Sequence, residues 1–453
     1  MVKTKSLYVC QECGAKSPSW IGQCSVCQSW NTFNLVDEQK SGAHSSAVVY
    51  QKPIPCDDVA IDDVVRLPSH IGELDLVLGG GFVPGSAVLL GGEPGIGKST
   101  FALQIALNMA QSGQKVLYIS AEESASQLLI RAKRIGVPCA SLLIFPEHDL
   151  AAILTCIKDE KPNLIILDSI QLVADQYHSS IEGSVSQVRL CAGQLINLIK
   201  NLSIVAILIG HVTKDGQLAG PKVLEHMVDV IFYIEGEREQ RCRVLRSYKN
   251  RYHNTQDIGL FEMSKDGLKE LSDPFFCLVN DQSLNQPGAV IAPVQQGHRV
   301  MMVELQALVV KSGFGPPKRN VVGVSIHRVQ LMVAILEKKC RIPLSTYDIY
   351  INLVGGIAIQ EPALDLAIVM AILSSYKEVS LPKYTGFIGE VGLAGEVRQV
   401  PNLDKRLRAM GKLGFRSCYV SNLVSKGQFS GCKTMLIDHI YHLLTLLDDT
   451  QNT

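Results

Sequence analysis

Short apolar runs alternate with longer amphipathic stretches through the middle of the chain. Helical patterns separate these runs, the first over residues 101–110. Because strands that alternate with helices usually pair in parallel, we predict an α/β domain over residues 58–275, with a mostly parallel sheet and helices on both faces. The five runs with the length and aliphatic composition of buried strands are residues 88–90, 116–120, 164–167, 204–209 and 230–234.

The pattern changes on either side of this domain. Residues 1–35 are rich in cysteine, and the polar residues 36–57 have the composition of a linker. We expect a second boundary around Asp273 and Pro274, followed by an α+β domain over residues 276–453. In this last region the strand patterns cover residues 300–310 and 321–324, and the helical patterns cover 329–338 and 364–374.

Composition narrows the class of protein. Of the 453 residues, 47% are hydrophobic, as in well-packed globular domains, and 43 Lys and Arg balance 43 Asp and Glu. The net charge therefore neither favours nor excludes nucleic acid, and any basic surface must be local. No apolar run approaches the ~18 residues of a membrane span, and the N-terminus lacks the apolar core of a signal peptide. We expect a cytoplasmic protein.

The strongest motif lies between the first strand and the first helix of the α/β domain. From Gly92 it runs glycine, four residues, then Gly-Lys-Ser, which is the pattern of a phosphate-binding loop. Glycines let backbone N–H groups surround phosphates at a helix N-terminus. We predict that Lys98 reaches the β- and γ-phosphates and that Ser99 binds magnesium. The residues expected to contact ATP here are Gly92, Glu93, Pro94, Gly95, Ile96, Gly97, Lys98, Ser99 and Thr100.

Two strand ends supply acidic residues to the same edge of the sheet. Asp168 follows residues 164–167, and we expect it to hold magnesium, usually through water. Glu122 and Glu123 follow residues 116–120, where a carboxylate can polarise the attacking water. We assign this catalytic role to Glu122, with Glu123 as helper or substitute. The alternative is that both acids only favour the N-terminus of the next helix.

Polar and basic residues follow the later strands. His211 stands where it can contact the γ-phosphate or simply be hydrogen-bonded, and the loop with Lys214 and Lys222 contacts either a nucleic-acid backbone or solvent. Residues 238–251 are rich in Arg and Lys, which usually indicates a solvated strand face. Lys249 and Arg251, at the end of this run, are candidates to contact the nucleotide of a neighbouring subunit, which requires a ring or filament.

Four cysteines form the motif of the N-terminal module. Two Cys-x2-Cys pairs, Cys10 with Cys13 and Cys24 with Cys27, are separated by ten residues. Each pair makes a turn that directs two sulfurs at one ion, so four thiolates complete a tetrahedral zinc site. We predict structural zinc, because no coordination position stays open and because so small a segment needs metal to fold. Two disulfides or a catalytic metal are the alternatives.

Both tryptophans of the chain, Trp20 and Trp30, lie in this module. We expect them to pack its small core. The alternative is that one of them offers a stacking face to a base or to a partner protein.

Taken together, these residues resemble the RadA (Sms) family of bacterial recombination and repair ATPases over nearly the whole chain. The resemblance implies a RecA-like core, then a domain similar to that of Lon proteases. It also implies a hexameric ring that uses ATP to move on single-stranded DNA and to extend recombination branches, with the recombinase RecA as a partner. Besides the cysteines and the phosphate-binding loop, it rests on residues 71–75, 78–81, 122–124, 210–214 and 224–229.

One departure from the family stands after the core. The family signature is Lys-Asn-Arg-Phe-Gly, whereas this chain has Lys249-Asn250-Arg251-Tyr252-His253. The resemblance places Lys249 and Arg251 at the subunit interface. If the family's glycine has a positive φ, His253 is costly there, and we then expect altered coupling between ATP and DNA.

The last domain allows a test for peptidase activity. Lon-type proteases use a serine nucleophile activated by a lysine. The resemblance aligns these positions with Ala363 and Asp404, while Lys405 is displaced by one residue. We therefore expect no peptidase, and a scaffold that closes the ring. Basic residues for DNA contact, or for a solvated face, are Lys311, Lys318, Arg319, Lys405, Arg406, Arg408, Lys412 and Arg416.

The leading hypothesis is an ATP-driven DNA motor of homologous recombination and repair. A nucleotide-dependent DNA-binding scaffold without movement is the alternative, because motor and clamp use the same site chemistry. An ATP-dependent protease is disfavoured by Ala363.

Overall fold

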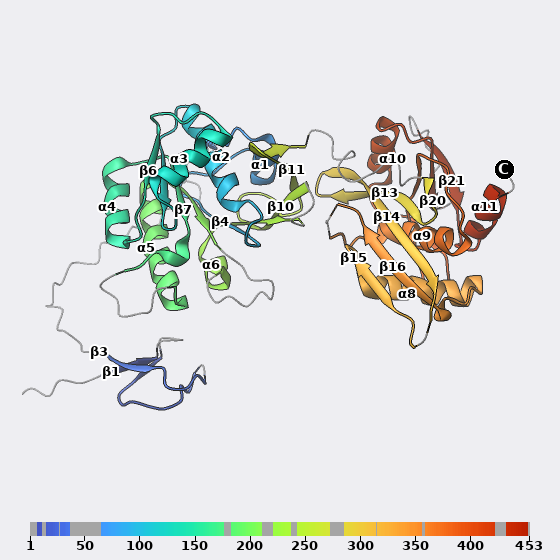
Figure 1. Ribbon diagram of the computed structural model, residues 1–453, viewed down its shortest axis with the longest axis horizontal. Coiled ribbons are helices and arrows are strands. Elements are labelled where there is room, and N and C mark those ends of the chain that lie inside the picture. Colours follow the sequence, from blue (N-terminus) through green and yellow to red (C-terminus); the bar gives the residue numbers. More distant parts are fainter. Residues whose placement is uncertain are drawn as a thin grey trace, which may run out of the picture. The chain divides into compact units, whose positions relative to one another are not determined.

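The structure is a computed structural model, and it contains sheets of three, nine, seven and two strands (Figure 1). The chain divides into two compact units, taken separately below. The first comprises Met1–Ile234, Ser247–Asn254 and Lys265–Leu268, and the second Glu235–Arg246, Thr255–Ser264 and Lys269–Thr453. The expected boundary at Asp273 and Pro274 lies outside the described residues, which are 7–10, 15–26, 28–36, 65–175, 183–210, 221–236, 242–271, 285–313, 315–355, 358–421 and 432–451.

The N-terminal module is a small antiparallel sheet in the order β2-β1-β3. Its strands are β1 (Leu7–Cys10), β2 (Lys16–Ser17) and β3 (Phe33–Val36). The buried core consists of Cys10, Cys24 and Phe33. A core of this size cannot hold a fold by hydrophobic burial alone, in keeping with a module that depends on metal.

The expectation that the two tryptophans pack this core is wrong. Trp20 is 53% exposed and Trp30 is 69% exposed. A Cβ built on Gly22 would lie 3.9 Å from the Trp20 ring and 4.0 Å from the Trp30 ring, so both rings flank this glycine at the surface. The physical reason is volume, because Phe33 and the buried cysteines already fill the interior.

The nine-stranded sheet has the order β12-β11-β10-β9-β4-β8-β7-β5-β6. Its six strands from β9 to β6 pair in parallel, which confirms the predicted sheet. Strand β10 pairs with β11 in antiparallel orientation. The strands are β4 (Ala87–Gly92), β5 (Val116–Ser120), β6 (Leu142–Phe145), β7 (Leu164–Asp168), β8 (Val205–Ile209), β9 (Val230–Glu235), β10 (Cys242–Asn250), β11 (Ile258–Ser264) and β12 (Gly267–Glu270).

Helices cover both faces of the parallel strands, as predicted. Helices α4 (Leu150–Glu160) and α5 (Val185–Leu202) pack against the face formed by Leu89, Ile119 and Leu167. Helix α2 (Lys98–Gln111) contacts the same strands from the other face, because neighbouring strand residues point to opposite sides. The remaining helices of this unit are α1 (Gly72–Leu78), α3 (Ala125–Ile135), α6 (Pro221–Met227) and the short 3-10 helix η2 (Ile170–Leu172).

The second unit is built on a mixed sheet in the order β15-β16-β14-β13-β17-β20-β21. The strand expected at residues 321–324 begins and ends earlier, at Arg319–Val322, because Gly323 has a φ of 81° and ends it. The sheet strands are β13 (Ala289–Gln296), β14 (Arg299–Lys311), β15 (Arg319–Val322), β16 (Tyr347–Leu353), β17 (Thr385–Phe387), β20 (Ser417–Ser421) and β21 (Lys433–Ile437), and β18 (Glu390–Val391) pairs with β19 (Val397–Arg398).

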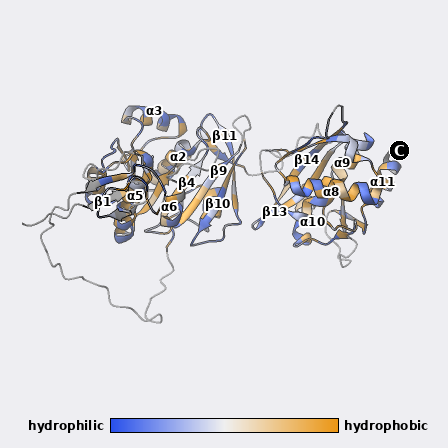
Figure 2. Cartoon of the chain, turned by 90° about the horizontal axis from the view of Figure 1, so that it is seen from below, coloured by the Kyte–Doolittle hydropathy of each residue, from blue (hydrophilic) through white to orange (hydrophobic). Residues whose placement is uncertain are grey.

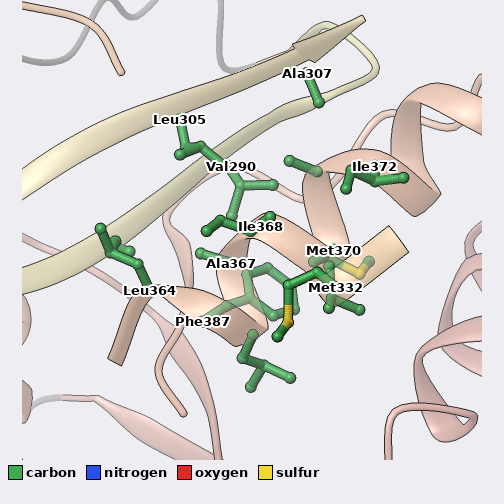
Figure 3. Packing of buried hydrophobic residues seen from close by; sticks show 14 of the residues in the cluster. Val290, Leu305, Ala307, Met332, Leu364, Ala367, Ile368, Met370, Ile372 and Phe387 are labelled. Carbon is green, nitrogen blue, oxygen red and sulfur yellow. The ribbon is translucent and has the colours of Figure 1, made fainter. Parts of the chain in front are cut away.

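Helix α9 (Asp365–Lys377) is the centre of this unit, since every residue from Asp365 to Ser375 is buried. Figure 3 shows Ile368 and Met370 of this helix among Val290 and Leu305 of the sheet. Helix α10 (Leu403–Lys412) belongs to a separate hydrophobic cluster with Ile291 and Met302. The remaining helices are α8 (Ile326–Cys340), α11 (His442–Gln451), η4 (Leu344–Thr346) and η5 (Pro362–Leu364).

Hydropathy follows this architecture. Figure 2 shows hydrophobic residues along the strands of both units, and helices with mixed faces such as α3 and α10. Within the described ranges, no helix combines the length and apolar character that crossing a membrane requires.

Candidate nucleotide-binding site

The predicted phosphate-binding loop joins β4 to α2. Gly92, Gly95 and Gly97 have φ values of 147°, 78° and 113°, which residues with side chains rarely adopt. A Cβ on Gly92 would also lie 2.8 Å from the carbonyl oxygen of Ile234. Glu93, Pro94 and Gly95 face solvent, Ile96 is buried, and Ser99 and Thr100 are half-buried at the helix start. The loop thus needs its glycines and presents its tip outward.

Lys98 is the first residue of α2 and is only 4% exposed. Its Nζ donates to the carbonyl oxygens of Gly92, at 2.9 Å, and Glu93, at 3.1 Å. Burial lowers the pKa of Lys98, and the charges of Asp168 and Glu122 partly offset this shift. These opposing effects place Lys98 near both candidate acids, with loop carbonyls as its hydrogen-bond partners.

Asp168 ends strand β7, directly opposite Ser120 of β5 in the sheet register. Its Oδ2 accepts a hydrogen bond from the Tyr118 hydroxyl at 2.9 Å. Its Oδ1 is buried and has no hydrogen-bond partner in the part of the chain that the structure describes. A buried carboxylate oxygen without a donor favours a cation or the water of a cation. The donor set of Asp168 and Ser99 therefore fits magnesium.

The structure separates the two glutamates. Glu122 accepts a hydrogen bond from Ser169 Oγ at 2.8 Å, and its charge acts on Lys98. Glu123 forms an ion pair with Arg131 of α3. Neither lies in the first turn of α3, which begins at Ala125 and is capped by Ser124. Of the two glutamates, Glu122 is the one whose charge acts on Lys98 of the phosphate-binding loop.

Gln171 was missed by the sequence analysis. Its side-chain Oε1 and Nε2 are both buried without a hydrogen-bond partner among the described residues. A Cβ built on Gly210, after β8, would lie 3.6 Å from Nε2. A polar residue three positions after Asp168 was the available signal. His211 lies outside the described residues, as does Lys214, and the structure describes no side chain for Lys222.

Lys249 and Arg251 are engaged within their own chain. Lys249 Nζ donates to the carbonyl oxygens of Glu225 and Val228, both at 2.7 Å, at the end of α6. Arg251 Nη1 donates to Asp229 Oδ1 at 2.9 Å. Asp229 is 1% exposed and also accepts from the backbone N–H of Ala87 at 3.1 Å. These contacts join β10 to α6 and to the strand that leads into the phosphate-binding loop.

His253 does not meet the condition under which it was expected to be costly. Among the residues that the structure describes, His253 is not one of those with a positive φ. Its backbone N–H donates to Asn250 Oδ1 at 3.1 Å. Its ring lies against Gly79, which ends α1 with a φ of 81°; a Cβ on Gly79 would lie 2.6 Å from His253 Cγ.

The two arginines before Lys249 that the structure describes, Arg243 and Arg246, do not form a simple solvated face. Arg243 is 3% exposed and donates to the carbonyl oxygen of Cys242 at 2.8 Å. Arg246 Nε donates to Glu235 Oε2 at 3.1 Å.

The two halves of the cysteine module make matching turns. The backbone N–H of Cys10 donates to Ala15 O at 2.8 Å, and that of Cys24 donates to Ser29 O at 2.9 Å, so each bond spans the same number of residues. Both cysteines are buried. Cys13 and Cys27 lie outside the described residues. The repeated turn around buried thiols fits a four-thiolate zinc site.

In the second unit, Arg406 was expected to lie on an exposed basic face, and this expectation is wrong. It is 1% exposed, pairs with Glu361, and donates to the carbonyl oxygens of Pro293 at 2.7 Å and Pro401 at 3.2 Å. Its position on α10 points inward, toward the sheet. Ala363 is also buried, in the same cluster as Leu403. Of the other basic residues proposed for DNA contact, Arg319 is half-buried, and the exposed ones are Lys311, Lys318, Lys405, Arg408, Lys412 and Arg416.

Three protein-family models match parts of the chain. A model of the KaiC ATPase family matches residues 67–143, a rubredoxin metal-binding domain matches 8–34, and subunit ChlI of Mg-chelatase matches 310–422. DNA repair protein RadA of Bacillus subtilis (strain 168) is 42% identical over 424 residues, covering 92% of each chain. The chain belongs to the RadA family of DNA repair proteins.

Other relatives agree with RadA membership. The RadA of Aquifex aeolicus is 39% identical over 450 residues, covering 99% of this chain and 100% of that protein. The RadA of Streptococcus pyogenes serotype M1 is 40% identical, covering 94% and 95%. The fold class is thereby confirmed: a zinc ribbon, a RecA-like ATPase core and a C-terminal Lon-like domain. A solved KaiC-like protein from Pyrococcus horikoshii is 22% identical, with a TM-score of 0.40, and covers 46% of this chain and 99% of its own.

Proposed function

We propose that this RadA-family ATPase is a motor that hydrolyses ATP to move on single-stranded DNA and promotes branch migration during homologous recombination and repair. The observation that carries the proposal is the convergence of Lys98, Asp168 and Glu122 at one phosphate-binding loop. A buried cation and two carboxylates are the groups that nucleotide hydrolysis requires.

Each of these residues has a separate task. Lys98 exchanges the loop carbonyls that it now contacts for phosphate oxygens, which are better partners for an ammonium because they carry charge. Glu122, held by Ser169, orients the attacking water and accepts its proton. Asp168 and Ser99 are the residues that would hold magnesium, which neutralises phosphate charge when bound. We retain His211 as a contact of the γ-phosphate.

Coupling to DNA requires more than one subunit. We propose a homo-hexamer in which Lys249 and Arg251 contact the nucleotide of the adjacent subunit. Arg251 is 54% exposed at its side chain, so it can leave Asp229 for a phosphate, and Lys200 also pairs with Asp229 and keeps that carboxylate neutralised. Lys249 and Arg251 would then have two states, one with the contacts seen in the single chain and one in contact with the nucleotide of the adjacent subunit.

We propose that the Lon-like domain serves assembly and DNA contact, not proteolysis. Ala363 carries no nucleophile, and its burial leaves no space for a substrate carbonyl. Lys405, Arg408 and Lys412 are exposed and share one face of α10, which suits sequence-blind contact with phosphates. We also keep the division into residues 1–35, 36–57, 58–275 and 276–453, with single-stranded DNA, branched intermediates and RecA as partners.

A branch-migration assay separates the motor from a clamp. A three-strand intermediate with a labelled strand is incubated with the full-length protein and ATP, alongside Lys98→Ala and the matched surface control Lys115→Ala. The motor predicts ATP-dependent strand release by the wild type and by Lys115→Ala, and none by Lys98→Ala. Binding to the intermediate without strand release would contradict the motor and support a scaffold that binds DNA without moving.

A further inference from the structure

Tyr118 is the one polar ring in the apolar strand β5. It is fully buried, in the centre of the ATPase core. A buried tyrosine hydroxyl needs a hydrogen-bond partner, and here the partner is Asp168 Oδ2, at 2.9 Å. The sheet register explains the contact. Ser120 is opposite Asp168, and side chains two residues apart share a face, so Tyr118 and Asp168 point to the same side.

The hydroxyl makes the two oxygens of Asp168 unequal. Oδ2 is occupied by Tyr118, whereas Oδ1 is buried and has no hydrogen-bond partner within the described ranges. With one oxygen anchored, the carboxylate cannot rotate without breaking that bond in a medium where no water replaces it. The unpartnered oxygen is therefore held in one direction.

We propose that Tyr118 is a positioning residue that fixes the Asp168 carboxylate so that Oδ1 is presented to the magnesium ion, or to its water, that accompanies the nucleotide. This inference rests on the proposed function, because it assumes a magnesium–nucleotide complex at the loop. Outer hydrogen bonds to metal-binding carboxylates are known to orient them, and losing one typically costs ~10–100-fold in metal affinity.

The surroundings of Tyr118 keep it a donor. The direction of the hydrogen bond follows from its two partners, because an ionised carboxylate only accepts hydrogen bonds and the Tyr118 hydroxyl is therefore the donor. The nearby cation, Arg131, is paired with Glu123. Tyr118 is therefore the group that donates to Asp168 Oδ2.

The test uses the full-length protein with Tyr118→Phe, which removes one oxygen atom and leaves the ring. Binding of a fluorescent ATP analogue is measured against magnesium concentration, and again in EDTA. We expect the magnesium concentration for half-maximal binding to rise about tenfold. Binding in EDTA should stay unchanged, because it depends on the loop and Lys98. That EDTA measurement also reports whether the variant has folded.

Two further variants sharpen the result. Tyr376→Phe, in the second unit, removes a hydroxyl that bonds to Tyr347 and should leave both titrations unchanged. In an Asp168→Asn background, Tyr118→Phe should add little further magnesium requirement, since its effect passes through that carboxylate.

An unchanged magnesium dependence of Tyr118→Phe would overturn the proposal. So would equal losses with and without magnesium, which would mark Tyr118 as merely structural. Failure of the proposed motor is distinguishable, because it would appear as a wild-type protein that binds the magnesium–nucleotide complex without moving on DNA.

Discussion

Replacing Arg406 by alanine is expected to destabilise the second unit, although its neighbours on α10 are exposed basic residues. Arg406 is 1% exposed, whereas Lys405 is exposed. The guanidinium pairs with Glu361 and donates to the carbonyl oxygens of Pro293 and Pro401. Its loss would leave a carboxylate and two carbonyl groups without these donors.

The surroundings of Glu361 determine how much stability Arg406→Ala loses. Removing one partner of a buried ion pair costs ~3–5 kcal/mol, because the remaining charge stays desolvated. The Glu361 side chain is 19% exposed and also accepts from the backbone N–H of Gln295 at 3.0 Å, so water and this bond compensate part of the loss. We therefore expect a loss of about 3 kcal/mol, at the lower end of that range. Lys405→Ala should change stability by less than about 0.5 kcal/mol.

Hydrogen exchange in the full-length protein measures this difference locally. Amides of α10 in Arg406→Ala should exchange about a hundredfold faster than in the wild type, since 1.4 kcal/mol corresponds to tenfold. Arg406→Met combined with Glu361→Met should recover part of the loss, because no buried charge remains unpaired. Equal exchange rates in Arg406→Ala and Lys405→Ala would refute the reasoning and would indicate that Arg406 lies on an exposed basic face.

Four further predictions test the rest of the molecule. Glu122→Gln should slow single-turnover ATP cleavage by ~10²–10⁴-fold with nucleotide binding retained, whereas Glu123→Gln should have a much smaller effect because Glu123 pairs with Arg131; equal losses would contradict the division of roles. Burial lowers the pKa of Lys98, so its ammonium should lose its proton below pH 10.5, the ordinary lysine value. Nucleotide affinity should therefore fall as the pH is raised toward 10.5. Affinity that stays constant up to that pH would be inconsistent with the lowered pKa. Gly79→Ala should destabilise α1 by at least about 2 kcal/mol in hydrogen exchange, since positive φ and the His253 ring both oppose a Cβ, and His253→Ala should relieve only the second part. A chelator should release one zinc per chain and change the tryptophan fluorescence, which reports the ribbon alone because Trp20 and Trp30 are the only tryptophans; unchanged fluorescence after metal release would show that zinc does not hold the ribbon.

The core of the ATPase fold was predictable from the sequence because its strands are buried on both faces. Strand β5 and the apolar residues of β7 coincide with the predicted runs, and the glycine spacing located the loop between β4 and α2. Strand β6 (Leu142–Phe145) was missed, because it is short and its residues are only half-buried, so its pattern is weak.

Side-chain partnerships were harder to predict because the sequence does not state which contacts a residue makes. Arg406 has the same helical spacing as exposed basic residues, and only the position of Glu361 shows that it points inward. Trp20 and Trp30 suggested a core by their type, but the ribbon is too small to enclose them. Tyr118 stood inside an apolar run and had no distinguishing mark until its hydroxyl was placed against Asp168.

The central claim is that ATP hydrolysis at the Lys98 loop drives movement on DNA. The most direct measurement is steady-state ATP hydrolysis by the full-length protein, with and without single-stranded DNA, across a salt series and beside Lys98→Ala. We predict several-fold stimulation by DNA that fades as salt screens the phosphate contacts, and no turnover in Lys98→Ala. Hydrolysis that is indifferent to DNA at every salt concentration, or that survives in Lys98→Ala, would contradict the account.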